Sequence, residues 1–372
     1  MNRSPAEPRV LVVPASYFAR DRTIGGGERY ALEYARALSR LTPTTLALFD
    51  IDASSERLGS LEVRRFGIKH FNQRWRFPLT QESRRAIREF DVYHSMVFPT
   101  PLTDSLILSA RLQGKIAVLT DVGGGGACWS TYLTKLHPRL SLNRLAHALA
   151  PLSKHGASFF SDWPQPQSIL YGGVNLDEFQ PENKPPLGYA LFVGRLLWHK
   201  GILEIIQAIP PEVPLHVVGR PYDQAYLGKL QTAAQGKNIQ FVLNADDNEL
   251  KRQYAGANVV LQPSLPSDDP GGDKSELLGL VTLEAQAMAK PVIVTRVASL
   301  PELVLDGETG FIIPAHDPAA LREKITWLVG NPALSRSMGL AARSYIESKF
   351  TWDKVAERGL ALYRSLLSTK NN

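Results

Sequence analysis

Short apolar runs alternate with segments of helical periodicity along most of the chain. The first run, "RVLVVPAS", is followed by "GGGERYALEYARALSRL", in which apolar residues recur at helical spacing. Further runs that predict strands are "TTLALFD", "DVYHSMV" and "KIAVLTD". The segment from Asn143 to Phe160 is predicted to be largely helical. This alternation of strands and helices favours a parallel α/β architecture.

The stretch "QSILYGGVNLDEFQPENKPPLG" interrupts the pattern with glycines and prolines and predicts a domain linker. After it, "YALFVGRL", "PLHVVGR", "IQFVL", "NVVLQPS" and "KPVIVTRV" predict the strands of a second doubly wound unit. We therefore expect Rossmann-like domains at residues 1–172 and 173–350. Residues 351–372 are predicted to form a helix that packs back towards the first domain. Because ligands bind beyond the carboxyl ends of parallel strands, two such domains predict a cleft between those edges.

Two glutamates lie eight positions apart, Glu276 and Glu284, within the apolar segment "KSELLGLVTLEAQAMAKPVIV". Gly279 is a poor interior residue for a helix, so we expect a helix to begin near Leu280, with Glu276 in the preceding loop. A buried carboxylate without partners costs several kcal/mol. Glu284 is therefore expected to meet specific donors, because its helix is apolar nearly all round. For Glu276 alone, a solvated loop position is an equal alternative.

Two cations follow a predicted strand in "GRLLWHKG", Arg195 and Lys200. A guanidinium and an ammonium group, with Gly194 and Gly201 allowing close backbone approach, can neutralise two phosphates without a metal. The alternative is a pair of exposed cations at the entry to a helix. The first amides of the helix that starts at Leu280 would add further donors, because they lack internal partners.

Three glycines, Gly25, Gly26 and Gly27, lie between the first strand and the first helix. They allow the backbone to approach an anion or a sugar at the positive end of that helix, or they form only a tight turn. The loop is too short for a P-loop and is not a GxGxxG fingerprint. A nucleoside triphosphatase or a dinucleotide-dependent oxidoreductase would thus lack its diagnostic loop.

Composition limits the class of protein. A chain of 372 residues with 44% hydrophobic content can bury two cores. The single cysteine, Cys128, excludes a disulfide framework, and "MNRSPAEPR" lacks the apolar core of a signal peptide. We therefore expect a cytoplasmic protein. The net charge of +6 suits phosphate-bearing ligands, although so modest a charge is more often only a solvated exterior. Apart from the local stretch Arg57–Arg88, the basic residues form no stripe with stacking aromatics, so we expect no nucleic-acid partner.

The pattern "PS…ELLGLVTLEAQAMAKPVIV" resembles the E-x7-E signature of the retaining glycosyltransferases of family 4, which have the two-domain GT-B fold. The resemblance is most specific over residues 191–313, where "LFVGRLLWHKG", "SLPELV" and "DGETGFIIP" follow in family order and spacing. The linker "ILYGGVNLDEF" is also similar, with Gly172 where asparagine is usual and Asn175 where aspartate is usual.

The resemblance implies roles for individual residues. Residues 1–172 would bind the acceptor and residues 173–350 the nucleotide-sugar donor. Glu284 would hold the ribose hydroxyls of the donor, and Glu276 the hydroxyls of the transferred sugar. The base would lie near Gly219, Arg220 and the loop around Ala245. The implied donor-binding residues are Gly25, Gly26, Gly27, Gly194, Arg195, Lys200, Gly219, Gly279, Leu280, Val281 and Glu284, and the implied catalytic residues are Glu276, Arg195, Lys200 and Asp121.

The implied reaction moves a hexose-type sugar from a nucleoside diphosphate to a hydroxyl of a saccharide, lipid-linked or small-molecule acceptor, as in polysaccharide or glycoconjugate biosynthesis. It would retain the anomeric configuration and need no metal or other cofactor. Asp121 stands where many relatives have a histidine, and it either assists at the sugar or caps a turn. The loop from Leu265 to Ser275 is longer than usual and is either a flap over the donor sugar or a plain solvated loop.

Other interpretations remain open at this level. A nucleotide-sugar epimerase or hydrolase would share the architecture. A metal-dependent transferase would use a DxD motif, which Asp50 and Asp52 supply. His94 is expected to be a satisfied core or cleft-edge histidine. The basic stretch Arg57–Arg88, interleaved with aromatics, predicts either peripheral contact with an anionic membrane or a solvated surface.

Overall fold

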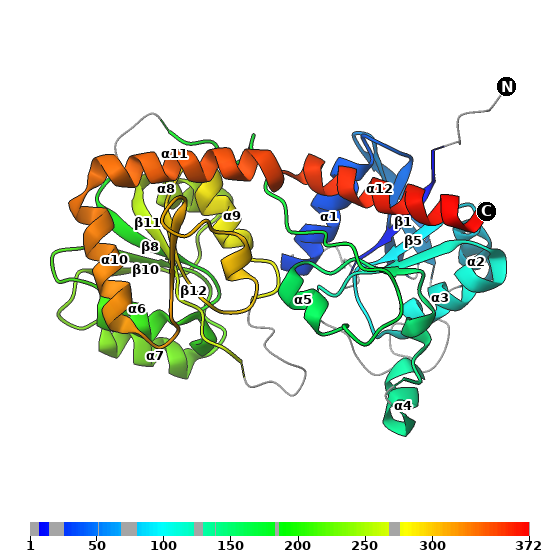
Figure 1. Ribbon diagram of the computed structural model, residues 1–372, viewed down its shortest axis with the longest axis horizontal. Helices are drawn as coiled ribbons and strands as arrows, with labels where there is room; N and C mark the ends of the chain where they lie inside the picture. Colours follow the sequence, from blue (N-terminus) through cyan, green and yellow to red (C-terminus); the bar gives the residue numbers. More distant parts are fainter. Residues whose placement is uncertain are drawn as a thin grey trace. The chain divides into compact units, whose positions relative to one another are not determined.

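The computed structural model describes residues 7–14, 26–50, 52–67, 80–122, 129–137, 139–182, 186–267 and 276–371. It divides into two compact units (Figure 1). Unit 1 comprises Met1–Gly173 and Trp352–Asn372, and unit 2 comprises Val174–Thr351. No described helix is long and apolar enough to cross a membrane.

The described part of unit 1 contains a seven-stranded sheet in the order β3-β4-β2-β1-β5-β6-β7. Its strands are β1 (Val10–Val13), β2 (Thr44–Asp50), β3 (Ser54–Leu58), β4 (Leu61–Gly67), β5 (Val92–Ser95), β6 (Ile116–Leu119) and β7 (Ala148–Leu149). Its helices are α1 (Gly26–Leu38), α2 (Gln81–Ile87), α3 (Pro101–Gln113), α4 (Trp129–Leu136), η1 (Leu142–Leu145), α5 (Lys154–Ser158) and α12 (Trp352–Asn371). Strands β1, β5 and β6 are buried at every position, as parallel strands covered on both faces require.

Two parts of unit 1 differ from the sequence-based expectation. The prediction that Asn143 to Phe160 is largely helical is wrong, because β7 adds a buried strand to β6 in the middle of this segment. Ladder pairing, with Val118 opposite Ala148, overrides the helical preference of alanine and leucine. An antiparallel hairpin of β3 and β4, which was not predicted, also overlaps the start of the basic stretch Arg57–Arg88.

A buried chain of hydrogen bonds joins α12 to α1 and to the sheet of unit 1. Tyr34 Oη lies 2.6 Å from Tyr363 Oη, which lies 2.5 Å from His94 Nδ1. His94 Nε2 lies 2.7 Å from Thr120 Oγ1, and that hydroxyl donates to the carbonyl of Ala150. Because Thr120 donates onwards, it accepts from His94 Nε2–H, so Nδ1 accepts from Tyr363. His94 is fully buried with both ring nitrogens bonded, and its prediction as a satisfied core histidine is confirmed.

The burial of His94 predicts a pH dependence of stability. Burial lowers its pKa from 6.5 to about 3, so the unfolded chain binds one more proton between these values. The stability that this difference in proton binding contributes is fully present above pH 6.5 and is lost as the pH falls from 6.5 towards 3. In His94→Gln the slope of unfolding free energy against pH, measured by urea titration below pH 6, should decrease by about 1.4 kcal/mol per pH unit. His137→Gln, which replaces an exposed histidine of unit 1, is the control. An unchanged slope in His94→Gln would contradict the assignment.

In the described part of unit 2, six parallel strands lie in the order β10-β9-β8-β11-β12-β13. The strands are β8 (Tyr189–Val193), β9 (Leu215–Val218), β10 (Ile239–Val242), β11 (Ala257–Gln262), β12 (Val292–Thr295) and β13 (Gly310–Ile313). The helices are η2 (Trp198–Lys200), α6 (Ile202–Ala208), α7 (Gln224–Ala233), α8 (Asp247–Gly256), α9 (Leu280–Ala287), η3 (Leu300–Glu302), α10 (Pro318–Gly330) and α11 (Pro332–Lys349). The five strands predicted for this half of the chain are confirmed.

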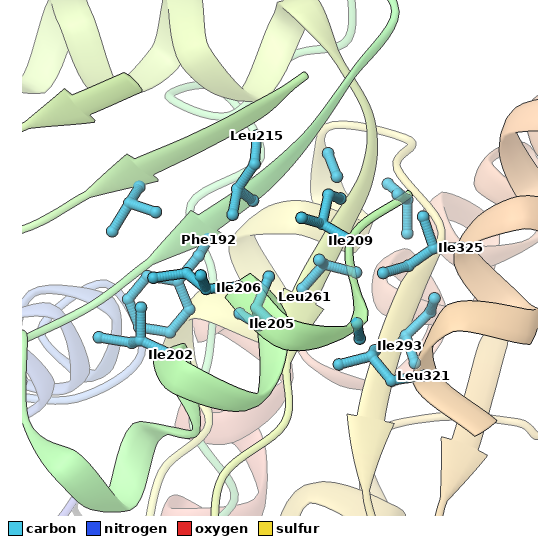
Figure 2. Close-up of a cluster of buried hydrophobic side chains, with 14 of the residues drawn as sticks. Phe192, Ile202, Ile205, Ile206, Ile209, Leu215, Leu261, Ile293, Leu321 and Ile325 are labelled. Atoms are coloured by element: carbon cyan, nitrogen blue, oxygen red, sulfur yellow. The ribbon is translucent and has the colours of Figure 1, made fainter. Parts of the chain in front are cut away.

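The core of unit 2 lies between its sheet and helices α6, α7 and α10 (Figure 2). Ile202, Ile205 and Ile206 of α6 pack against Phe192 and Leu261 on the central strands β8 and β11. The three isoleucines recur at helical spacing in α6 and are almost completely buried. The packing fixes α6, and with it the loop that connects β8 to α6, against the sheet.

Candidate functional site

The sequence-predicted residues of unit 2 gather at the carboxyl edge of its sheet. The chain moves from β8 outwards to β9 and β10, and then returns to the other side of β8 with β11. The loops after β8 and β11 therefore diverge at a topological switch point, which is where open α/β sheets bind ligands. Gly194–Gly201 follows β8, and Pro263–Ser267 follows β11.

Close backbone packing holds these loops together. The backbone N–H of Leu265 donates to the carbonyl of His199 at 2.7 Å, so the loop after β11 is tied to the loop after β8. Leu196 N donates to the carbonyl of Arg220 at 3.0 Å and ties in the loop after β9. A Cβ on Gly219 would lie 1.7 Å from the carbonyl oxygen of Gly194, so only glycine allows this approach.

Gly201 offers a test of this packing. Its φ is +68°, and a Cβ there would lie 1.9 Å from the carbonyl oxygen of Pro263. Gly201→Ala should lower the free energy of unfolding by about 2 kcal/mol or more, measured by chemical denaturation. Gly228→Ala is the matched control, because Gly228 is helical and has no atom within 4 Å of the added methyl group. That control should be neutral or slightly stabilising. Equal stabilities of the two variants would contradict the packing described here.

Glu276 forms a buried ion pair with Lys200. The two residues are only 9% and 8% exposed. Glu276 Oε1 accepts from Lys200 Nζ and, at 3.0 Å, from Ser264 Oγ. Its backbone carbonyl accepts from Ser299, from the amide at 3.2 Å and from the hydroxyl at 2.7 Å. Lys200 is therefore not an exposed helix-entry cation, and Glu276 is not a solvated loop residue.

Arg195 differs from Lys200 in its surroundings. Its side chain is exposed and makes no ion pair with the described residues, and its guanidinium carbon lies 5.7 Å from the centre of the Tyr222 ring. The two cations that the sequence presents as a pair thus divide. Lys200 is bound to the carboxylate of Glu276, whereas Arg195 is accessible to an anion from solution.

Helix α9 begins at Leu280, as predicted, directly after Gly279 in the left-handed conformation. A Cβ on Gly279 would lie 2.3 Å from Leu303 Cδ1, so a larger residue would displace this start. The amides of Leu280 and Val281 therefore open the helix. Glu284 is partly buried, and its Oε2 accepts from Tyr254 Oη at 2.9 Å. It thus meets a specific donor, as expected of a carboxylate in an apolar helix.

Unit 1 brings together a second set of predicted residues. Gly26 and Gly27 are the first residues of α1, and Gly25 lies outside the described residues. A Cβ on Gly27 would lie 3.0 Å from Val122 Cγ2, so the start of α1 lies beside the end of β6. Asp121, which precedes Val122, is partly buried at this edge. The segment 268–275 of the predicted flap lies outside the described residues.

The structure also shows where the residues of the DxD motif and of the basic stretch lie. Asp50 ends β2, and Asp52 is exposed beyond it. No group of three His, Cys, Asp or Glu side chains suited to a metal occurs among the residues that were described. In the basic stretch, Arg64 is paired with Glu62 and Glu89. Arg65 pairs with Glu56, Phe66 is buried, and residues 68–79 lie outside the described ranges.

Several contacts of the site were not predicted from the sequence. Lys200 and Glu276 are 76 positions apart, and nothing in either motif indicates that they touch. Ser264 lies just after the end of β11, and Ser299 lies beyond the end of β12. Their position after parallel strands is the one signal that would have indicated them, because such strand ends share one edge of the sheet.

Part of the chain resembles known proteins in sequence. Residues 175–345 match the sequence profile of the family "Glycosyl transferases group 1". D-inositol 3-phosphate glycosyltransferase from Corynebacterium diphtheriae is 29% identical over 226 residues, which cover 54% of this chain and 51% of that relative. The chain thus spans about half the length of the curated relatives it matches.

Solved structures resemble almost the whole chain. Sucrose-phosphate synthase from Thermosynechococcus elongatus has a TM-score of 0.72 and 21% identity, with 97% of this chain and 100% of that chain covered. Anabaena HepE in complex with UDP and glucose has a TM-score of 0.71 and 17% identity, with 96% and 100% covered. At these identities the likeness concerns the fold, and it confirms the predicted GT-B fold class with two Rossmann-like domains.

Proposed function

We propose that the protein is a retaining hexosyltransferase, because residues 175–345 match the group 1 glycosyl transferases and the chain has the GT-B fold. Its donor is a nucleoside diphosphate sugar, and its acceptor is a hydroxyl of a saccharide, lipid-linked or small-molecule compound. Transfer proceeds without a metal ion. The observation that carries the proposal is the buried Glu276–Lys200 pair at the switch point of the sheet, with the accessible Arg195 in the same loop as Lys200.

Arg195 and the start of α9 supply the positive groups for the donor diphosphate. A guanidinium binds phosphate oxygens through two parallel N–H donors, and the first amides of a helix add uncompensated donors. When the nucleoside diphosphate departs, negative charge develops on its phosphate oxygens. Fixed positive groups stabilise that charge, so they lower the barrier more than they stabilise the bound donor.

Glu276 holds the hydroxyls of the transferred sugar. Lys200 and Ser264 both bond Oε1, and Oε2 has no hydrogen-bond partner among the described residues. The occupied oxygen fixes the carboxylate, and the other oxygen accepts from a sugar hydroxyl in a charge-assisted hydrogen bond. Lys200 balances the buried charge of Glu276, so that the carboxylate is held without a solvation shell.

Glu284 plays the corresponding part at the nucleoside end. Its Oε2 is fixed by Tyr254, as Glu276 is fixed by its own partners. Its carboxylate binds the vicinal ribose hydroxyls.

In the chemistry proposed here, the departing phosphate oxygen takes the proton of the incoming acceptor hydroxyl on the same face of the sugar. The acceptor oxygen then bonds to the anomeric carbon as the bond between that carbon and the donor's phosphate oxygen breaks. The anomeric configuration is retained.

The test separates donor binding from transfer. Thermal unfolding is first measured with UDP, GDP and ADP, beginning with UDP because Anabaena HepE was solved with it. At least one nucleotide should raise the Tm, and a set without any shift would refute the donor site. The sugar donor of the stabilising nucleotide is then incubated with and without candidate acceptors. Sugar release or interconversion without an acceptor would favour a hydrolase or an epimerase. Loss of transfer with EDTA and its recovery with Mn²⁺ would refute metal independence.

A lipid-linked acceptor would bring the protein to an anionic membrane. The exposed cations of the basic stretch Arg57–Arg88, namely Arg57, Arg84, Arg85 and Arg88, are one candidate surface for such contact. Arg64 and Arg65 contribute little to it, because they are paired with carboxylates of unit 1.

A further inference from the structure

Helix α4 of unit 1 contacts α3 through its residue Ser130. Ser130 is only 1% exposed, its amide donates to Asp104 Oδ2 at 3.0 Å, and its hydroxyl bonds Asp104 Oδ1. Asp104 lies on α3 and is itself buried. On the other side of α4, Tyr132 is 43% exposed and Leu136 is 79% exposed. An amphipathic helix on a globular domain normally has the opposite orientation, with its apolar residues towards the core.

The exposed apolar surface continues beyond α4. Leu140 is 49% exposed and follows Tyr132 and Leu136 at the same four-residue spacing. Leu145 of η1 is 42% exposed, and η1 packs against α4. We call Tyr132, Leu136, Leu140 and Leu145 the α4 patch. Helix α4 projects from the rest of unit 1, so the patch is available to a broad, flat partner (Figure 1). Single exposed leucines are ordinary, but a cluster of them marks an interaction surface.

The charge around the α4 patch selects the partner. The sequence contains no Asp or Glu between Asp121 and Asp162, and Asp162 is paired with Arg144. Lys135 and Arg139 are exposed within the patch, and Lys135 Nζ lies 5.1 Å from the centre of the Tyr132 ring. Apolar side chains mixed with cations, in a segment whose sequence carries no acid, complement an anionic lipid surface. A second copy of the chain fits less well, because a two-fold contact would place like charges against one another.

We propose that the α4 patch docks unit 1 on an anionic lipid bilayer. Leu136 and Leu140 enter the boundary between head groups and acyl chains, and Tyr132 lies at the head-group level, where its ring is apolar and its hydroxyl stays hydrated. Lys135 and Arg139 contact the lipid phosphates. This docking needs neither donor nor acceptor, so its test is independent of the proposed transferase activity.

The test is sedimentation of the full chain with vesicles of phosphatidylcholine mixed with phosphatidylglycerol, at low and at high salt. The wild-type protein should bind, and less so in high salt. The variant Leu136→Ser/Leu140→Ser should weaken the partition about tenfold or more, because two leucines no longer leave water. Leu334→Ser/Leu340→Ser is the control, since it replaces two exposed leucines of α11, which are 52% and 55% exposed. It should bind as the wild type does. Thermal unfolding checks that both variants fold.

A second pair of variants distinguishes the α4 patch from the basic stretch. Lys135→Gln/Arg139→Gln should weaken vesicle binding several-fold, whereas Arg84→Gln/Arg85→Gln should leave it nearly unchanged. The proposal is overturned if the wild-type chain does not sediment with anionic vesicles at low salt, or if only the Arg84 and Arg85 variant loses binding. It is also overturned if sedimentation velocity shows a dimer that Leu136→Ser/Leu140→Ser dissociates while vesicle binding is unaffected.

Discussion

The Glu276→Gln variant should turn over its sugar donor about a hundredfold or more slowly than the wild type. A neutral amide then replaces the charged acceptor that holds the transferred sugar in the transition state. The amide also leaves Lys200 buried without its ionic partner. The measurement is kcat at saturating donor, followed by release of the nucleoside diphosphate. Nucleotide affinity, measured with the nucleoside diphosphate alone, should change little. In Glu284→Ala that affinity should instead be the quantity most weakened.

Two further variants separate the charge of Glu276 from its packing. Ser264→Ala removes a neutral donor to the same oxygen and should lower kcat much less. Lys200→Met/Glu276→Gln removes both members of the ion pair. If the loss of stability in Glu276→Gln comes from the broken ion pair with Lys200, the double variant should recover about 1–3 kcal/mol of it while remaining inactive. A wild-type kcat in Glu276→Gln would refute the role of this carboxylate.

The Arg195→Met variant should lower kcat/KM about 100-fold to 1,000-fold, because the departing diphosphate loses a fixed positive group. Arg195→Lys keeps the charge but loses the planar pair of donors, so its kcat/KM should fall between those of the wild type and Arg195→Met. Stability should be unaffected in both, since the side chain is exposed and makes no ion pair with the described residues.

Arg252→Met is the matched control for Arg195. Arg252 is an exposed arginine of the same unit, on α8, and pairs with Glu249. Its replacement should leave kcat/KM within about twofold of the wild type, because an exposed pair of this kind contributes little. If Arg195→Met also retains wild-type kcat/KM, the donor diphosphate binds elsewhere, and the position of the site on the sheet is wrong.

The parts of the site that the sequence predicted depend on local features. Gly279 and the apolar run after it predicted where α9 begins, and the same run indicated that Glu284 would need a specific donor. The strand before Arg195 likewise placed this residue at a sheet edge. Each of these features is contained in a few neighbouring residues, and backbone propensity with burial is sufficient to interpret them.

The parts that the sequence did not predict depend on contacts between distant segments. The ion pair of Lys200 with Glu276 is one such contact, which only the folded sheet creates. The strand β7 was missed for the same reason, because its residues favour a helix until β6 is available for pairing. The outward face of α4 is also invisible in the sequence, since the spacing of Tyr132 and Leu136 is that of an ordinary core-facing helix.

The place of α12 in unit 1 governs the order in which the protein assembles during synthesis. Unit 2 is one continuous stretch, Val174–Thr351, and all of it has been translated before α12 begins. Domains fold as units while the ribosome is still working, so unit 2 can reach its final structure first. Unit 1 begins earlier, yet His94 and Tyr34 stay without Tyr363 until the ribosome has passed the whole of unit 2. The half of the protein that is made first is therefore finished last.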